Sequence, residues 1–375
     1  MKNAFRKKHL LEILNNYSSY EGPLDLFLRN TFKRLRQIGS KDRKEITETI
    51  YSLVRHQGYY DYFCEKPVNW EKRLNAFELS LKETTEMSDH IKVSFPKFLF
   101  NKLENDYGTE CAIKICKTSN YPAPTTIRTN LLKTSREALI KILSPHCDAT
   151  PCDISPLGIN LSKRINFNIL DAFKNGLFEV QDEASQLAAL LATVRPNEKV
   201  LDYCAGSGGK SLAFGPFMKN KGLLCLYDIR PSAITQAKKR FKKSGIQNVQ
   251  FISDQKQLRP FKHQMDWIFL DVPCSGTGTL RRNPDMKWKL DEATIDNLIK
   301  EQRKIFEKAL QYLKPAGKIV YATCSMLKDE NENQINFFEK TFQMQLIGVP
   351  FSTFPCKNGM DGFFGVVLQK KIKSL

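Results

Sequence analysis

The sequence predicts an α/β protein whose C-terminal half is a parallel sheet covered by helices, preceded by a small α+β module and a helical N-terminal region. From Val200 onward, apolar strand-like segments alternate with amphipathic helical segments. This alternation is typical of parallel sheets with helices on both faces. Residues 1–115 instead show helical periodicity, and a proline-rich segment at Pro122 and Pro124 separates the two patterns. These observations predict three regions, at residues 1–115, 120–180 and 181–375.

The first region is expected to be all-helical. In residues 24–38 the apolar side chains recur at helical spacing, at Leu24, Phe27, Leu28, Leu35 and Ile38. A second helix is expected over residues 42–57, with Ile46, Ile50 and Leu53 on its apolar face. The first sixty residues carry twelve Lys and Arg against six Asp and Glu. An RNA-facing surface and an ordinary solvated face both fit this charge.

The second region combines short strands with one helix. TTIRT (residues 125–129) and GINLS (residues 158–162) have strand-like composition, and SREALIKIL (residues 135–143) has helical periodicity. A further helix, expected within QDEASQLAALLATV (residues 181–194), leads into the third region.

The third region should contain five strands, at residues 198–204, 222–228, 249–254, 266–271 and 318–324. Helices are expected between them, including residues 231–245 and 296–313. The first of these has Pro231 at its start and Gly245 just past its end, as helix termini prefer. In such sheets ligands bind beyond the carboxyl ends of the strands. The candidate functional residues are therefore those that follow each strand.

Composition narrows the class of protein. The chain has 58 Lys and Arg against 40 Asp and Glu, a formal net charge of +18, which favours a polyanionic partner such as a nucleic acid. The N-terminus lacks the apolar core of a signal peptide, and no apolar run is long enough to span a membrane. Ten cysteines occur without a Cys-x-x-Cys pair, so neither a zinc site nor a thiol redox motif is expected. Free thiols in a reducing cytoplasm are expected instead.

The first strand of the third region ends in a glycine-rich turn, LDYCAGSGGKS. Gly206, Gly208 and Gly209 would let backbone amides approach a ligand closely. A phosphate-binding P-loop is excluded by spacing, because Cys204 stands where its first glycine belongs. Asp228 and Asp254 end the next two strands, where carboxylates can bind the ribose hydroxyls and the adenine edge of a nucleoside. Taken singly, each feature is an ordinary turn or strand end; together they indicate an adenosine-bearing cofactor.

The last two strands end with reactive groups. One is followed by Asp271 and Cys274, and the other ends at Cys324. A strand-end cysteine is most often a small buried hydrophobic residue. Two at the ligand-binding edge, however, suit the methylation of cytosine carbon 5, in which a thiolate adds to carbon 6 and a carboxyl group contacts the pyrimidine edge. A basic, aromatic stretch follows Cys274 and could hold RNA and stack a base, although Trp288 could equally pack in a core; its residues are Arg281, Arg282, Lys287, Trp288 and Lys289.

These motifs resemble a known family. LDYCAGSGGKS, DVPCSGTGTLRRNPDMKWK, YATCS with the following ENE, and NGMDGFFGVVLQKK are similar to the RNA 5-methylcytosine methyltransferases of the RsmB/NOP/NSUN group. GLFEVQDEASQLAALL resembles that family's entry into the catalytic domain, and TIRTNLLKTSREALIKIL its small RNA-binding module. The N-terminal helices resemble, less distinctly, the NusB-like domain of the bacterial ribosomal RNA enzymes. The resemblance implies a class I S-adenosylmethionine-dependent (Rossmann-like) catalytic domain.

The resemblance also assigns roles to residues. Cys324 would attack carbon 6, Cys274 would assist product release, and Lys210 would help order the pocket. Contacts with S-adenosylmethionine are implied for Cys204, Ala205, Gly206, Ser207, Gly208, Gly209, Lys210, Asp228, Asp254 and Asp271. The family usually has proline where this chain has Ser207, and we expect serine to loosen the turn modestly and lower cofactor affinity.

The predicted function is therefore methylation of cytosine carbon 5 in RNA by a cytoplasmic enzyme, which is expected to be monomeric and to hold no metal. Ribosomal RNA is preferred as substrate on the N-terminal resemblance, with transfer RNA as the alternative. A non-catalytic RNA-binding or ribosome-assembly protein with the same fold is the main rival. An adenine amino-group methyltransferase fits less well, because Asp-Val-Pro-Cys replaces the Asn/Asp-Pro-Pro-aromatic motif of that class.

Overall fold

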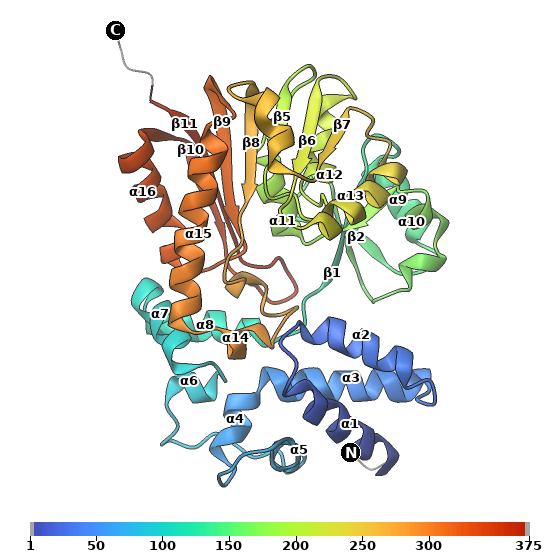
Figure 1. Cartoon of the computed structure of the whole chain (residues 1–375). Helices are drawn as coiled ribbons and strands as arrows, with labels where there is room; N and C mark the ends of the chain where they lie inside the picture. Colours follow the sequence, from blue (N-terminus) through green and yellow to red (C-terminus); the bar gives the residue numbers. More distant parts are fainter. Residues whose placement is uncertain (1–3, 372–375) are drawn as a thin grey trace. The chain divides into compact units, whose positions relative to one another are not determined.

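The computed structural model describes residues 4–371 (Figure 1). The described residues form two compact units. The first, here called the helical unit, runs to Pro122 and also contains Thr279–Glu292. The second, here called the sheet unit, contains Ala123–Gly278 and the described chain from Ala293 onward.

The helical unit has the all-helical structure that its periodicity predicts. Its helices are α1 (Ala4–Tyr17), α2 (Leu24–Arg34), α3 (Ser40–Arg55), α4 (Gln57–Tyr62), α5 (Trp70–Glu78), α6 (Asp89–Lys92), α7 (Lys97–Tyr107), α8 (Thr109–Ser119) and α14 (Met286–Lys289). The apolar faces of α1 and α3 meet in a core that includes Leu10, Ile46 and Ile50, each fully buried. Helix α2 ends at Arg34, earlier than expected, yet Ile38 beyond its end still reaches this core.

The segment Thr279–Glu292 is built into the helical unit and corrects one expectation. Arg281 and Lys287, considered as RNA contacts, are each only 1% exposed. The Lys287 ammonium donates hydrogen bonds to Arg55 O, Ser94 O and Asn120 Oδ1. The indole of Trp288 donates to Val54 O and packs against the helical core. These three side chains therefore stabilise the helical unit. Trp288 packs in a core, as the alternative interpretation of the sequence expected, rather than being free to stack on a base.

The sheet unit begins with a small antiparallel sheet of strand order β2-β3-β1-β4. Its strands are β1 (Thr125–Thr129), β2 (Ala149–Pro151), β3 (Gly158–Leu161) and β4 (Phe178–Val180). Helices α9 (Arg136–Leu143) and α10 (Asp171–Lys174) accompany it. Ile127, Leu139, Ile159 and Phe178 are fully buried in a core of their own. This is the α+β module that the sequence predicts, and it is here called the small module.

A seven-stranded sheet of order β10-β11-β9-β8-β5-β6-β7 forms the rest of the sheet unit (Figure 1). Its strands are β5 (Lys199–Asp202), β6 (Leu223–Tyr227), β7 (Val249–Ile252), β8 (Met265–Asp271), β9 (Leu313–Thr323), β10 (Met344–Thr353) and β11 (Phe363–Lys370). The five predicted strands pair in parallel. The antiparallel strands β10 and β11 were not predicted and extend the sheet beyond β9.

Helices cover both faces of this sheet. Successive side chains of each strand point to opposite faces, so each strand packs against both layers of helices. Ile268 and Leu270 face α15 (Glu292–Leu310) and α16 (Glu332–Phe342). Trp267 and Phe269 face the opposite layer, formed by α11 (Glu183–Leu190), α12 (Ser211–Phe214) and α13 (Pro231–Ser244).

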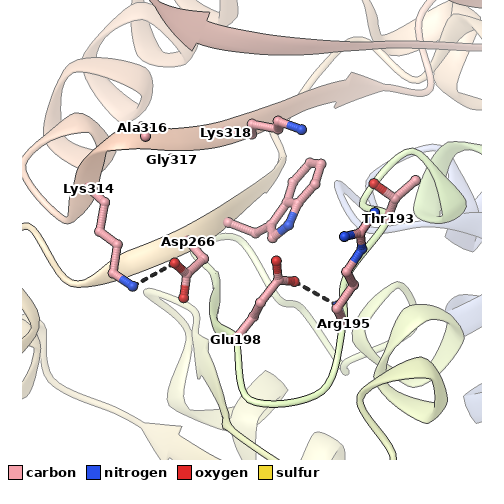
Figure 2. A pocket seen from close by; sticks show the side chains of 9 residues that line it. Thr193, Arg195, Glu198, Asp266, Lys314, Ala316, Gly317 and Lys318 are labelled. Carbon is pink, nitrogen blue, oxygen red and sulfur yellow. Dashed lines mark hydrogen bonds and ion pairs between the residues drawn. The ribbon is translucent and has the colours of Figure 1, made fainter.

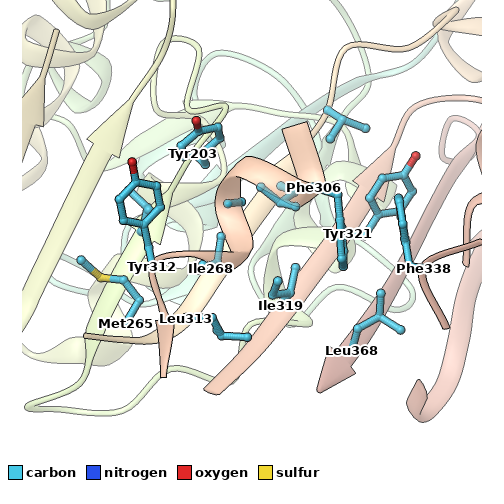
Figure 3. Close-up of a cluster of buried hydrophobic side chains, with 14 of the residues drawn as sticks. Tyr203, Met265, Ile268, Phe306, Tyr312, Leu313, Ile319, Tyr321, Phe338 and Leu368 are labelled. Carbon is cyan, nitrogen blue, oxygen red and sulfur yellow. The ribbon is translucent and has the colours of Figure 1, made fainter. Parts of the chain in front are cut away.

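The core under α15 and α16 is rich in aromatic residues (Figure 3). The rings of Phe306 and Phe338 stack with centroids 3.8 Å apart, and Tyr321 meets Phe338 edge-on. Burying each such side chain contributes roughly 1.5–3 kcal/mol to folding. This packing fixes β8 and β9, the two strands whose ends carry the candidate cysteines.

Helix α13 begins and ends as predicted, with Pro231 in its first turn and Gly245 in the left-handed conformation (φ 88°) after its last residue. Among the described residues, no helix is both long and apolar enough to cross a membrane.

Candidate active site

The glycine-rich turn, Cys204–Lys210, connects β5 to α12 at the carboxyl edge of the parallel strands. Gly206 and Gly208 have positive φ values of 53° and 80°. A Cβ on Gly208 would lie 2.7 Å from Phe241 Cε2, so a larger residue does not fit there. A Cβ on Gly206 would meet no neighbour closer than Arg230 Nη2 at 3.9 Å. The turn therefore leaves room at Gly206 for a ligand to approach the backbone.

Asp228 follows β6 and is tied to this turn. Its Oδ2 accepts a hydrogen bond from Gly206 N at 2.7 Å, and its Oδ1 accepts from Arg230 N and Nε. Burial opposes ionisation of Asp228, but these hydrogen bonds outweigh it and lower the pKa of the carboxyl group. Asp254 follows β7, is exposed, and caps the next turn by accepting from Lys256 N. The glycine-rich turn, Asp228 and Asp254 together fit an adenosine-bearing cofactor. The contacts of each residue with the cofactor remain predictions.

Under the turn lies a carboxyl group that was not among the candidates. Asp202, the last residue of β5, is fully buried and accepts a hydrogen bond from Ser211 Oγ at 2.6 Å. Burial raises the pKa of Asp202 to about 7. Its hydrogen bond to Ser211 links the end of β5 to the start of α12.

Lys210 and Asp271 form an ion pair between the turn and the end of β8. Lys210 Nζ lies 2.6 Å from Asp271 Oδ2, with Lys210 12% and Asp271 30% exposed. Burial opposes the charge on Lys210, but the Asp271 carboxylate, with a contribution from Cys324, raises the pKa of the ammonium group. The pair therefore joins the glycine-rich turn to the end of β8, with Lys210 near enough to Cys324 to interact electrostatically.

The two candidate cysteines meet in space. Cys274 and Cys324 lie 50 positions apart in sequence, and their Sγ atoms are 3.4 Å apart. The hydrogen bond with Cys324 and burial raise the pKa of Cys274 well above the ordinary thiol value. Cys274 therefore keeps its proton at neutral pH and is the expected donor in the contact between the two sulfur atoms.

A buried carboxylate that sequence reasoning missed holds the loop after Cys274. Glu330 is fully buried, accepts from Ser275 N at 2.9 Å and Ser275 Oγ at 2.5 Å, and also accepts from Gln302 Nε2. Its neighbour Asn331 accepts from Thr323 Oγ1 and donates to Ser325 O, on both sides of Cys324. The ENE motif therefore fixes both cysteine loops.

Two glycines also join these loops. Gly278 N donates to Cys324 O at 2.8 Å, and Gly362 N donates to Gly278 O at 2.9 Å. A Cβ on Gly278 would overlap the Gly362 carbonyl group, so this close approach requires glycine. The family-like motifs contain Glu330, Gly278 and Gly362, but their spacing assigns these residues no role, because the roles depend on contacts between distant segments.

A cavity of about 280 Å³ lies away from this site (Figure 2). Its lining comes from the amino-terminal ends of β5, β8 and β9 and comprises Thr193, Arg195, Glu198, Asp266, Trp267, Lys314, Ala316, Gly317 and Lys318. Lys314 Nζ donates a hydrogen bond to Asp266 Oδ1, and the backbone N–H of Arg195 donates to Glu198 Oε2. None of the candidate residues lines this cavity.

Comparison with known proteins identifies the family. Residues 188–369 match the family described as 16S rRNA methyltransferase RsmB/F, and residues 95–168 match its ferredoxin-like domain. The chain is 31% identical over 306 residues to ribosomal RNA small subunit methyltransferase B of Photorhabdus laumondii, covering 78% of this chain and 70% of that one. It is 31% identical over 279 residues to the protein of the same name from Proteus mirabilis, covering 74% and 66%.

Solved structures show the same fold. The structure of PH0851 superposes with a TM-score of 0.82 over 96% of this chain and 97% of that one, at 22% identity. A methyltransferase homologue from Pyrococcus horikoshii gives 0.68 over 77% and 100%, at 23% identity. The predicted fold class, a Rossmann-like methyltransferase domain, is thereby confirmed. The chain belongs to the RsmB/F methyltransferase family.

Proposed function

We propose that this chain methylates carbon 5 of cytosine in RNA, and that ribosomal RNA is its substrate. Membership of the RsmB/F family and the names of the curated relatives support an RNA methyltransferase acting on ribosomal RNA. The contact between the Cys274 and Cys324 sulfur atoms, at the ends of neighbouring strands, carries the proposal for cytosine carbon 5.

The chemistry needs a nucleophile because carbon 5 of cytosine attacks an electrophile poorly on its own. Addition of Cys324 Sγ to carbon 6 forms a carbon–sulfur bond and makes carbon 5 electron-rich. S-adenosylmethionine would supply the methyl group to carbon 5 as a sulfonium electrophile, with its sulfur atom leaving as a neutral thioether. A base then removes the carbon-5 proton, and the electron pair re-forms the ring double bond and expels Cys324 Sγ. The cytosine must be unpaired or flipped out of a duplex to reach these groups.

The surroundings of the two sulfur atoms support Cys324 as the nucleophile. Lys210, held by Asp271, lies close enough to Cys324 for that thiol to contribute to the raised pKa of its ammonium group. Cys274, whose raised pKa keeps it protonated, can donate a hydrogen bond to Cys324 Sγ. A protonated Cys274 beside Cys324 fits Cys324, rather than Cys274, as the nucleophile.

Asp271 is the carboxyl group placed for the pyrimidine edge. Its Oδ2 is held by Lys210 at 2.6 Å, so its orientation is set before substrate binds. It follows β8 directly and precedes Cys274 by three residues, which puts carboxylate and thiols on the same sheet edge.

Covalent trapping tests the proposal. Wild type, Cys274→Ala and Cys324→Ala would be incubated with S-adenosylmethionine and total RNA, then resolved by denaturing electrophoresis. Cys274→Ala should accumulate a protein–RNA adduct, because the product would not be released, whereas Cys324→Ala should form none. Cys356→Ala, which removes an exposed thiol, is the matched control and should behave as wild type.

Other outcomes discriminate between the alternatives. An adduct that requires Cys274 would reverse the two roles. Sequencing the trapped RNA would separate ribosomal from transfer RNA. If the wild-type protein binds S-adenosylmethionine but transfers no methyl group to any RNA, the chain is a non-catalytic RNA-binding protein.

A further inference from the structure

Ser207, which stands where the resembled family usually has proline, is held by a side chain from another element. Arg240 of α13 donates from Nη1 to Ser207 Oγ at 2.7 Å and to Ser207 O at 3.0 Å. One guanidinium nitrogen therefore binds both the hydroxyl group and the backbone of this residue.

Arg240 is itself held in place by Glu179 of β4. Glu179 Oε2 accepts from Arg240 Nη2 at 2.9 Å and from Nε at 3.2 Å. The Glu179 side chain is 12% exposed and that of Arg240 is 25% exposed, so the pair is largely removed from solvent. A guanidinium group bound on two edges has little freedom to move, because its donors have fixed planar geometry.

A second arginine holds the turn two residues further on. Arg128 of β1 donates from Nη1 to Gly209 O at 2.9 Å and to Gln181 Oε1. Arg128 is only 2% exposed, and burial lowers its pKa to about 9, which leaves it charged at neutral pH. The small module therefore contacts Gly209 directly, through Arg128 of β1, and reaches Ser207 indirectly, through Glu179 of β4 and then Arg240.

Proline restricts the backbone because its ring fixes φ. Serine lacks this restriction, so the turn needs another constraint to keep its amide groups oriented toward a ligand. The hydrogen bonds from Arg240 supply such a constraint, and the one to Ser207 Oγ requires a hydroxyl group at position 207.

We propose that Ser207, Arg240 and Glu179 form a brace through which the small module orders the cofactor turn, in place of the rigidity that a proline at position 207 would give. The three are positioning residues: they act on the turn rather than on the methyl group. The proposal reverses the sequence-based expectation that serine lowers cofactor affinity, and it rests on the cofactor site proposed above.

Calorimetric titration of the full chain with S-adenosylmethionine tests the brace. Arg240→Ala and Ser207→Ala should each weaken binding, with a loss of roughly tenfold for Arg240→Ala, as expected for lost hydrogen bonds to a charged group. Arg240→Lys should also weaken binding, because an ammonium group cannot bridge Ser207 and Glu179 as a guanidinium group does. In steady-state assays KM for S-adenosylmethionine should rise while kcat changes little.

The double variant separates the brace from a general packing role. Ser207→Pro should bind S-adenosylmethionine as wild type does. Arg240→Ala in that background should weaken binding by less than about threefold, because proline then fixes the turn. Lys239→Ala, which removes an exposed positive charge from the adjacent position of α13, is the matched control and should bind as wild type.

Equal losses from Arg240→Ala in the serine and proline backgrounds would overturn the brace. So would unchanged binding in Ser207→Ala and Arg240→Ala. If wild type itself does not bind S-adenosylmethionine, the proposed cofactor site fails instead. Thermal unfolding of the cofactor-free variants should show that each still folds cooperatively. Arg240→Ala removes the guanidinium partner of the largely buried Glu179 carboxylate, so its melting temperature should fall modestly. A general loss of fold would instead lower kcat as well as raise KM.

Discussion

At the scale of single residues, burial determines which basic side chains lie in the protein interior and which are exposed to solvent. Lys287 is 1% exposed, and burial lowers the pKa of its ammonium group well below the ordinary value. Three acceptors lie within 2.8 Å of Nζ, and the Phe95 ring centroid lies 4.3 Å away. This environment explains why Lys287, although it belongs to a basic, aromatic stretch, packs inside the helical unit and is not exposed for contact with RNA.

His56 gives the helical unit a predicted pH dependence. Burial, followed by the positive charges of Lys287 and Arg55, lowers the pKa of His56 to about 4. The unfolded chain binds the proton near pH 6.5, so stability is full above that pH and is lost as the pH falls toward 4. Between pH 7 and pH 5 the free energy of unfolding should fall by about 2 kcal/mol through this group.

Urea unfolding of wild type and His56→Gln at pH 7 and pH 5 measures this effect. The variant should lose about 2 kcal/mol less than wild type over that interval. His146→Gln, which removes an exposed histidine, is the control and should follow wild type. An identical pH dependence in wild type and His56→Gln would show that His56 titrates normally in the folded chain.

At the scale of elements, the site depends on how the loops after β8 and β9 are held together. Glu330, just before α16, accepts three hydrogen bonds from Ser275 and Gln302, and Asn331 binds both Thr323 and Ser325. The separation between the two thiols is therefore set by side chains that do not contact them directly.

Glu330→Gln should disturb the site while nearly preserving side-chain volume. An amide nitrogen would oppose the donors at Ser275 or Gln302, leaving a buried polar group unsatisfied at a cost of about 1–3 kcal/mol. We expect kcat to fall roughly tenfold or more as the Cys274 loop shifts. Methyl transfer and thermal unfolding measure the two effects, with Glu339→Gln on α16 as the control. If Glu330→Gln is less stable than wild type but keeps the wild-type kcat, Glu330 has only a structural role.

The sequence-based prediction misses elements whose formation depends on strand pairing rather than on the periodicity of apolar residues. Strands β5 to β9 are recognisable because each is a short apolar run between helices. Strand β10 is largely half-buried or exposed and pairs only along one edge with β11, so its apolar pattern is weak. Helix α2 ends before Leu35, although Ile38 still packs as its spacing suggests, because burial does not require a continuous helix.

At the scale of the whole molecule, a net charge of +18 should dominate the affinity for RNA. Part of this charge lies on α13, which contains no acidic residue and exposes Lys238, Lys239 and Lys242. Neutralising phosphates releases counterions, so binding weakens as salt rises. For about five contacted phosphates of single-stranded RNA, affinity should fall roughly a hundredfold between 50 and 200 mM salt.

Fluorescence anisotropy with a labelled RNA oligonucleotide at several salt concentrations measures this slope. A peptide nucleic acid of the same base sequence has an uncharged backbone and is the matched control, whose affinity should vary little with salt. A flat salt dependence for the RNA itself would mean that base contacts, not phosphate contacts, supply the binding energy.

The sequence alone determined the fold class, the five parallel strands, and the placement of turn, acids and cysteines at strand ends. These follow from local periodicity and from the rule that parallel strands share one carboxyl edge. Tertiary structure alone decided that Cys274 and Cys324 touch, that Lys287 is buried, and that Arg240 reaches Ser207. Periodicity reports which face of an element is buried, whereas these contacts depend on which distant segment packs against it.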